Sequence, residues 1–286
     1  MAKNKRGEIF RKQVMMPCNN VVRDVFLLLL AMTGIGLALS GILNKATSSL
    51  NPLFPERVKH FVSPPQSDSK LPVVTAPSAD PNDELGKILA KTANSNKTVI
   101  LTALNWAWAE PNTMIDLFLE SFRIGEGTEE LLQNLLIVAL DAKTYNRCLE
   151  IHHHCYSLKT RGVDYSGEKF YMSDDYLKMM WTRLGFLGDV LRRGYNIIFS
   201  DTDIMWLRNP MGRLEPDADI QITSDKYNGD PFDMKNEANT GYMYVCSNER
   251  TIGFYRYWYL SRRLFPGKKE QDVLNILKLS QGFSRR

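Results

Sequence analysis

The sequence predicts an α/β domain that follows a membrane anchor and a disordered stem. From Thr98 onward, apolar runs of strand length alternate with longer runs that have helical spacing, and this alternation is typical of a sheet with crossover helices. Before that point, an uncharged segment at 25–43 is followed by a segment rich in proline and serine at 44–92. These observations predict one folded domain at 93–286.

The predicted strands are short apolar runs rich in β-branched residues, bounded by polar or turn-forming residues. The first three are TVILTAL at 98–104, LLIVAL at 135–140 and YNIIFS at 195–200, and two more are expected at 219–223 and 241–246. Sequence alone orders them along the chain but leaves their pairing open.

The predicted helices carry apolar residues three and four positions apart. They are expected at 112–122, 143–153, 174–193, 250–264 and 270–279. The helix at 174–193 has the strongest signals, since Ser173 can cap its N-terminus and Gly194 can end it. It also carries one apolar stripe: Leu177, Met180, Leu184, Leu187 and Leu191.

The uncharged segment at 25–43, VFLLLLAMTGIGLALSGIL, is 19 residues long. As a helix it spans about 28 Å, close to the thickness of a bilayer core. Basic residues precede it in the tail at 1–24, so the positive-inside rule places that tail in the cytosol and the rest of the chain in a lumen. A cleaved signal peptide and a buried core helix are the alternatives, and the long basic and apolar regions favour the anchor.

Charge is concentrated at the N-terminus. Residues 1–43 contain six of the 36 Lys and Arg residues and two of the 32 Asp and Glu residues, a net charge of +4. The remaining 243 residues therefore carry 30 basic and 30 acidic side chains. A neutral body gives no support to nucleic-acid binding, which requires a basic face.

The segment at 44–92 is predicted to be a stem without stable structure. Seven of the 13 prolines fall between Pro52 and Pro81, and no helical or alternating apolar pattern persists. Beyond it, three cysteines are expected to face the lumen. Cys148 and Cys155 are seven positions apart, and on a continuous helix they would be roughly 10 Å apart, too far for a disulfide. The pairing of these two and Cys246 is left open.

Two carboxylates follow the third predicted strand directly, at Asp201 and Asp203. Ligands of open α/β sheets bind beyond the carboxyl ends of the strands, and alternate residues of an extended chain point the same way. Two carboxylates suit Mg²⁺ or Mn²⁺ held together with substrate phosphates. A solvated turn is the alternative, and the apolar run Ile204–Leu207 after the pair favours a functional site.

Four segments together carry a family resemblance: ALNWAWAEPNTMIDLFLESF at 103–122, the stretch YLKMMWTRLGFLGDVLRRGYNIIFSDTDIMWLRNP at 176–210, EANTGYMYV at 237–245 and EQDVLN at 270–275. They resemble plant nucleotide-diphospho-sugar transferases of glycosyltransferase family 77. The resemblance covers about 99–278. It implies a GT-A type, Rossmann-like fold, a UDP-pentose or UDP-galactose donor, and transfer with retention of configuration.

The resemblance also implies the acceptor and the location. Acceptors would be cell-wall polysaccharides or hydroxyproline-rich proteins. The protein would be a single-pass type II Golgi membrane protein with a lumenal catalytic domain, able to associate with itself or with other Golgi transferases.

Roles for individual residues follow from the resemblance. Asp203 would bind Mn²⁺ (or Mg²⁺) most directly, and Asp201 would reach the metal and the ribose. The other implied residues are sugar-binding Asn239, Thr240 and Gly241, the pair Gln271 and Asp272 near the reacting carbon, and Asn105 near the nucleotide. Asp272 is also the candidate carboxylate nucleophile.

Three further residues have two interpretations each. Arg183 and Lys178 precede the acidic pair on a predicted helix, where either can contact the diphosphate or lie on a solvated helix face. Asp141 follows the second strand and is either a nucleotide contact or a helix cap. His152, His153 and His154 occupy successive helix positions that diverge by about 100°, so we expect an exposed helix end rather than a zinc site.

The resemblance is incomplete at the C-terminus. The family continues past the EQDVLN segment with a strand and a metal-binding His, whereas no His follows His154 here. We therefore expect the domain at 93–286 to be incomplete at its C-terminus. An inactive scaffold or glycan-binding subunit is one alternative function, and a two-metal hydrolase is another, although few further acidic or His residues cluster near the strand ends.

Overall fold

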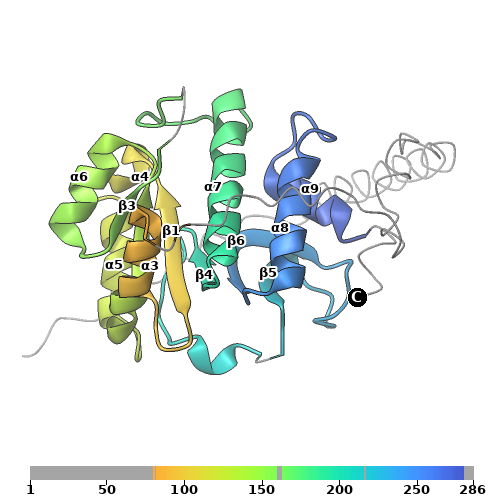
Figure 1. Ribbon diagram of the computed structural model, residues 1–286, viewed down its shortest axis with the longest axis horizontal. Coiled ribbons are helices and arrows are strands. Elements are labelled where there is room, and N and C mark those ends of the chain that lie inside the picture. The colour runs from red at the N-terminus through yellow and green to blue at the C-terminus, as the bar shows by residue number, and fades with distance from the viewer. Residues whose placement is uncertain (1–79, 81, 160–162, 216, 280–286) are drawn as a thin grey trace, which may run out of the picture. The chain divides into compact units, whose positions relative to one another are not determined.

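The computed structural model describes residues 80, 82–159, 163–215 and 217–279 (Figure 1). The predicted anchor at 25–43 and the tail at 1–24 lie outside these residues. In the described part, no helix combines the length and the apolar character needed to cross a membrane.

A mixed six-stranded sheet forms the centre of the described domain, with strand order β3-β2-β1-β4-β6-β5. Its strands are β1 Thr98–Leu104, β2 Leu135–Ala139, β3 Cys155–Ser157, β4 Asn196–Ser200, β5 Ile220–Lys226 and β6 Glu237–Val245. The first four run parallel to one another, whereas β6 is antiparallel to both β4 and β5. The five predicted strands are confirmed, and the three-residue β3 is an addition.

Seven α-helices surround this sheet within the described residues. They are α3 Glu84–Thr92, α4 Trp106–Ala109, α5 Met114–Ile124, α6 Ala142–Ile151, α7 Asp174–Arg192, α8 Glu249–Ser261 and α9 Glu270–Leu277. The five predicted helices are confirmed with shifted ends. Ser173 caps α7 as predicted, and Gly194 after it adopts a φ of +79°, the left-handed region that glycine enters readily.

Side chains of the strands alternate between two cores because successive residues of a strand face opposite sides of the sheet. In β1, Val99 and Leu101 pack with α3, α7, α8 and α9, and Ile100 packs with α4 and α5. Figure 1 shows α4, α5 and α6 on one side of the domain and α7, α8 and α9 on the other. The sheet is therefore covered on both faces, as expected for parallel strands.

The predicted stem is wrong over its last nine residues. Glu84–Thr92 form α3, which is capped by the Asp83 carboxylate. Leu85 and Leu89 of this helix are buried in the same core as Val99. The proline-rich composition further upstream masked this short amphipathic pattern.

The expectation that Cys148 and Cys155 are too far apart is also wrong. The helix α6 ends at Ile151 instead of continuing, and the chain reverses into β3. The two Cα atoms are therefore 6.0 Å apart and the residues form a disulfide, within the usual range of Cα separations.

The early end of α6 also changes the histidine segment. His152 is the C-cap of α6, not a helical residue, and its Nε2 lies 2.8 Å from the Leu135 carbonyl oxygen. It is half-buried rather than exposed. No group of three or more His, Cys, Asp or Glu residues suitable for a metal is present in the described residues.

The strand order creates a switch point between β1 and β4. From β1 the chain continues outward to β2 and β3, while β4 and then β6 extend the sheet on the other side. Open α/β sheets bind ligands beyond the carboxyl ends of strands at this kind of position. Asn105 follows β1 there, and Asp201 follows β4.

Candidate functional site

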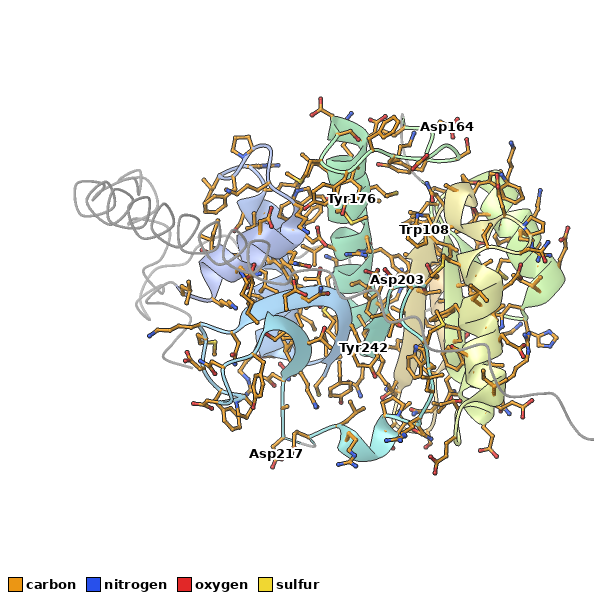
Figure 2. All side chains as sticks on the ribbon, turned by 180° about the vertical axis from the view of Figure 1, so that it is seen from behind. Trp108, Asp164, Tyr176, Asp203, Asp217 and Tyr242 are labelled. Atoms are coloured by element: carbon orange, nitrogen blue, oxygen red, sulfur yellow. A yellow bond between two sulfur atoms is a disulfide. The ribbon has the colours of Figure 1, made fainter. Side chains whose placement is uncertain are left out.

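The acidic pair lies where β4 ends beside β6. The Asp201 backbone N–H donates to the Gly241 carbonyl at 2.7 Å, and its own carbonyl accepts from the Ile204 N–H at 3.2 Å. Residues 201–204 therefore form a turn, so the expected extended alternation is wrong. Asp203 is exposed, and Figure 2 shows it between Tyr176 of α7 and Tyr242 of β6.

One residue of the apolar run after the pair anchors this turn. Trp206 is buried and stacks on Phe122 of α5 with ring centroids 4.5 Å apart. Its indole N–H donates to Ser200 Oγ at 3.0 Å, and its backbone N–H donates to Ser121 Oγ at 2.9 Å. Met205 and Leu207, in contrast, are exposed. Trp206 therefore holds both ends of the turn relative to the sheet.

Gly241 packs directly against the acidic pair. A Cβ atom at this position would lie 2.9 Å from Asp201 Oδ2 and 2.9 Å from Asn239 Oδ1, which is closer than real Cβ contacts. The group that approaches Gly241 in the structure is the Asp201 carboxylate, and the close approach of a sugar to Gly241 stays a prediction.

Arg183 of α7 links the acidic pair to α9. Its Nη1 donates to Asp201 Oδ1 at 2.6 Å, and its Nη2 donates to Glu270 Oε1 at 2.7 Å. The Arg183 side chain is only 9% exposed and the Glu270 side chain 3%, and the guanidinium also lies over the Phe199 ring at 4.7 Å. The alternative interpretation of Arg183, a solvated helix face, is therefore wrong, and its contact with a diphosphate stays a prediction.

Burial and neighbouring charge act on both ends of this ion pair. Burial raises the pKa of Asp201 to about 6; Arg183 opposes this rise, while the nearby charges of Asp203 and Glu270 add to it. Burial alone would lower the pKa of Arg183, but the carboxylates of Asp201 and Glu270 raise it above its ordinary value. Arg183 is therefore a permanent cation between two acids.

The predicted sugar-binding residues form a second network. The Asn239 Oδ1 accepts from the Gly241 N–H at 2.7 Å, and the Gln271 Oε1 accepts from the Thr240 N–H at 3.1 Å. Thr240 is buried, and its hydroxyl lies 3.2 Å from Glu270 Oε1 and 3.3 Å from Gln271 Oε1. The structure thus brings four predicted residues, Asn239, Thr240, Gly241 and Gln271, together with Glu270.

Asp272 stands apart from this network. It lies in the first turn of α9, two positions after Glu270, and is therefore rotated by about 200° around the helix axis. Within the described residues, the Asp272 carboxylate accepts no hydrogen bond from Asn239 or Gln271. The role of Asp272 as nucleophile stays a prediction.

Three other predicted residues are occupied by structural contacts. The Asn105 Nδ2 donates to the carbonyls of Tyr165 at 2.9 Å and Gly167 at 3.1 Å, so it anchors the loop before α7. The Asp141 carboxylate caps α6 through the Thr144 N–H at 2.9 Å, which confirms the helix cap. Lys178 is exposed and pairs with Asp175 at 3.2 Å.

Sequence reasoning missed two acids of the site, Glu270 and Asp225. Glu270 lies directly before Gln271, and in sequence it reads as a helix-start acid favoured by the helix dipole. Asp225 lies in β5, where the register with β6 shifts, and accepts from Asn239 Nδ2 at 2.7 Å. No local sequence signal pairs Glu270 with Arg183, which lies 87 residues earlier.

The carboxylates present fit a divalent cation. Asp203 and the Oδ2 of Asp201 offer hard oxygen ligands, while the Oδ1 of Asp201 is held by Arg183. Mg²⁺ and similar cations are commonly bound by one or two carboxylates and complete their shell with phosphate oxygens and water. A site with two protein carboxylates is therefore sufficient when a diphosphate is bound with the metal.

Comparison with known proteins identifies relatives for most of the described domain. The sequence profile of the nucleotide-diphospho-sugar transferase family matches residues 130–285. An uncharacterized protein of Arabidopsis thaliana is 48% identical over 196 residues, which is 68% of this chain and 51% of the relative.

Two Arabidopsis thaliana relatives have named activities. Arabinosyltransferase RRA1 is 26% identical over 66% of this chain and 44% of its own length. UDP-D-xylose:L-fucose alpha-1,3-D-xylosyltransferase 3 is 23% identical over 78% of this chain and 54% of its own length. The chain spans about half the length of these curated relatives.

Proposed function

This chain belongs to the nucleotide-diphospho-sugar transferase family, and we propose that it is a glycosyltransferase that moves a sugar from a UDP-sugar to a glycan or glycoprotein acceptor. The observation that carries this proposal is the acidic turn at the switch point, where Asp201 is clamped by buried Arg183. The proposal includes a GT-A type fold for the domain.

The acidic turn would bind the donor diphosphate through a divalent cation, Mn²⁺ or Mg²⁺, with Asp203 and Asp201 Oδ2 as its protein ligands. The metal supplies positive charge that stabilises the UDP leaving group. Arg183 keeps the Asp201 carboxylate in place and offsets the repulsion between Asp201 and Glu270. Because the turn is fixed by Trp206, the two carboxylates are preorganised before substrate arrives.

The sugar would lie near Gly241, whose missing Cβ lets the Asp201 and Asn239 side chains pack against the backbone of β6. Gln271 fixes the Thr240 backbone below it. In the transfer step, the bond from the anomeric carbon to the UDP oxygen breaks and a bond to the acceptor oxygen forms on the same face. The acceptor hydroxyl passes its proton to the departing diphosphate oxygen on the same face, and UDP leaves with the bonding electron pair.

The substrate class follows from the relatives. Arabinosyl- and xylosyltransferases among the relatives favour a UDP-pentose donor, and a galactosyltransferase among them keeps UDP-galactose in the proposal. For the acceptor we propose a cell-wall polysaccharide or a hydroxyproline-rich protein. A retaining outcome is part of the same proposal.

We place this activity in the Golgi lumen, with 25–43 as a single type II anchor. The disulfide between Cys148 and Cys155 supports an oxidising compartment, since cytosolic proteins rarely keep such bonds. Association with other Golgi transferases is compatible with this location.

Calorimetry of UDP binding to the full-length chain, purified in detergent with and without Mn²⁺, tests the proposal. We expect binding that requires Mn²⁺ and that Asp203→Ala reduces at least tenfold. Asp217→Ala is the matched control, because Asp217 is an exposed acid in the loop before β5 (Figure 2). Absence of UDP binding by the folded wild-type chain would contradict the proposal and favour a scaffold role.

A further inference from the structure

Asp225 is an exposed carboxylate that the proposed reaction does not yet use. It lies in β5 between Ser224 and Lys226, where the register with β6 shifts. Such irregularities re-aim a side chain relative to the rest of its strand. Here the carboxylate reaches across to two amide side chains that line the proposed sugar site.

Both oxygens of Asp225 are engaged by these amides. Its Oδ1 accepts from Asn239 Nδ2 at 2.7 Å, and its Oδ2 accepts from Gln271 Nε2 at 3.3 Å. Each amide therefore has its orientation fixed, because its oxygen accepts from a backbone N–H of β6. Asp225 thus determines which way the two amide nitrogens face.

Asp225, Asn239 and Gln271, called the trio below, keep unused hydrogen-bonding groups in a defined arrangement. A carboxylate offers about four lone-pair sites, and within the described residues Asn239 and Gln271 use one each. Each amide nitrogen carries two N–H groups, and in the described part of the chain each donates only one hydrogen bond, to Asp225. Acceptor sites on Asp225 are therefore flanked on both sides by free N–H donors.

A pair of neighbouring hydroxyl groups matches this arrangement. Each hydroxyl of a vicinal diol can donate to Asp225 and accept from one amide N–H. Asn239 Oδ1 and Asp201 Oδ2 lie equally close to the position of a Cβ on Gly241. Asn239 therefore places the trio next to Asp201, where the diphosphate would bind. A sugar attached to a diphosphate at Asp201 would present its ring hydroxyls toward Asp225.

We propose that Asp225 is a specificity-determining residue that accepts hydrogen bonds from a vicinal diol of the donor sugar. This assignment rests on the proposed UDP-sugar site and names a further contact within it. Asp225 discriminates sugars by their hydroxyls and makes no contact with the nucleotide.

The test compares UDP with UDP-sugars on the full-length chain in detergent with Mn²⁺, by calorimetry. The probes are UDP, UDP-xylose, UDP-galactose and UDP-arabinose. We expect Asp225→Asn to weaken the UDP-sugar that binds best by about 10- to 100-fold, the loss typical of hydrogen bonds to a charged group. UDP binding stays within twofold of wild type. Asp217→Asn, at an exposed acid outside the site, is the matched control and changes neither.

A second measurement separates direct contact from an effect on Asn239 and Gln271. Monodeoxy analogues of the best UDP-sugar remove one hydroxyl at a time. Removal of a hydroxyl that donates to Asp225 lowers the affinity for the wild type but not for Asp225→Asn. This result supports the proposal. Equal penalties for every hydroxyl in both proteins would overturn it.

The remaining outcomes are also decisive. Equal weakening of UDP and UDP-sugar by Asp225→Asn, or no weakening at all, overturns the role of Asp225 and leaves the nucleotide site intact. If the wild type binds UDP and all three UDP-sugars with equal affinity, the role of Asp225 is likewise overturned and the nucleotide site stands. If the folded wild-type chain binds none of the four probes, the proposed function fails and the Asp225 assignment fails with it.

Discussion

Arg183 donates to Asp201 at 2.6 Å from a position that is almost completely buried. The same guanidinium reaches Glu270 of α9, so the acidic turn after β4 is connected through α7 to the last helix of the described domain. Within the described residues, the Oε2 of Glu270 has no hydrogen-bond partner, so Arg183 is the cation that compensates both the buried Glu270 and the half-buried Asp201. The acidic turn and the core of the domain are therefore energetically coupled.

Arg183→Met is expected to destabilise the domain strongly. Removing one partner of a buried ion pair costs about 3–5 kcal/mol, because the remaining charges stay buried without compensation. We expect the free energy of unfolding to fall by about 3 kcal/mol, the lower end of this range. Water can still solvate Asp201, because its side chain keeps 35% of its surface exposed. Urea unfolding followed by tryptophan fluorescence measures this change.

Lys178→Met provides the control on the same helix. Lys178 is exposed and pairs with Asp175, and such surface pairs contribute about 0–1 kcal/mol. Equal losses for the Arg183 and Lys178 variants would show that the buried pair has no special role.

Gly241→Ala is expected to affect ligand binding more than stability. Its φ is not in the left-handed region, so the backbone tolerates alanine. The new Cβ instead meets Asp201 Oδ2 and Asn239 Oδ1, and both must move. We expect UDP affinity in Mn²⁺ to fall at least tenfold, with a loss of about 1–3 kcal/mol in unfolding free energy from overpacking.

Gly253→Ala is the matched glycine control. Gly253 lies inside α8, and a Cβ there has open space around it. Alanine in a helix interior is favoured over glycine by about 0.5–1 kcal/mol, so stability rises and UDP affinity is unchanged. Unchanged UDP affinity in Gly241→Ala as well would remove Gly241 from the site.

The strands and helices were predictable because their signals are local. The apolar stripe of α7 and the runs that form β1, β2 and β4 depend on residues a few positions apart. The three-residue β3 and the early end of α6 at Ile151 were not predictable in this way. Both depend on the chain reversal that brings Cys155 beside Cys148, and no local periodicity describes a reversal.

The site was predictable only where its residues are consecutive. Asp201 and Asp203 follow a strand directly, so their place at the sheet edge could be inferred. The partners of Arg183 are 18 and 87 residues away, and pairing over such distances depends on how α7 and α9 pack. Asp225 was missed for the same reason, since its position follows from a register shift between β5 and β6.

The disulfide gives a prediction about both stability and location. The sequence separation of Cys148 and Cys155 is seven, and closing so short a loop stabilises the fold by about 2 kcal/mol. We expect Cys148→Ala to lower the free energy of unfolding by about that amount. In protein recovered from cells and alkylated in denaturant without reductant, both cysteines should remain unmodified, whereas free Cys246 reacts. Alkylation of all three would contradict the lumenal location.

His152 makes stability dependent on pH near neutrality. Burial lowers the pKa of His152, although its hydrogen bond to Leu135 opposes this, and burial also lowers the pKa of His154. Below the ordinary pKa of about 6.5 the unfolded chain therefore binds more protons than the folded chain. The histidine contribution to stability is complete above that pH and is lost as the pH falls through the folded pKa.

His152→Gln is expected to reduce this pH dependence. Glutamine can still donate to the Leu135 carbonyl, which His152 Nε2 contacts at 2.8 Å, but it does not titrate. The variant should therefore lose less unfolding free energy than wild type between pH 7.5 and pH 5, in urea unfolding at each pH. His153→Gln is the control, because His153 is exposed and acts on its neighbours only through its charge, so it should change the wild-type slope less than His152→Gln does. Protonation of an imidazole that burial keeps neutral must lower the free energy of unfolding. Parallel plots of unfolding free energy against pH for wild type and His152→Gln would therefore show that His152 is not the titrating group.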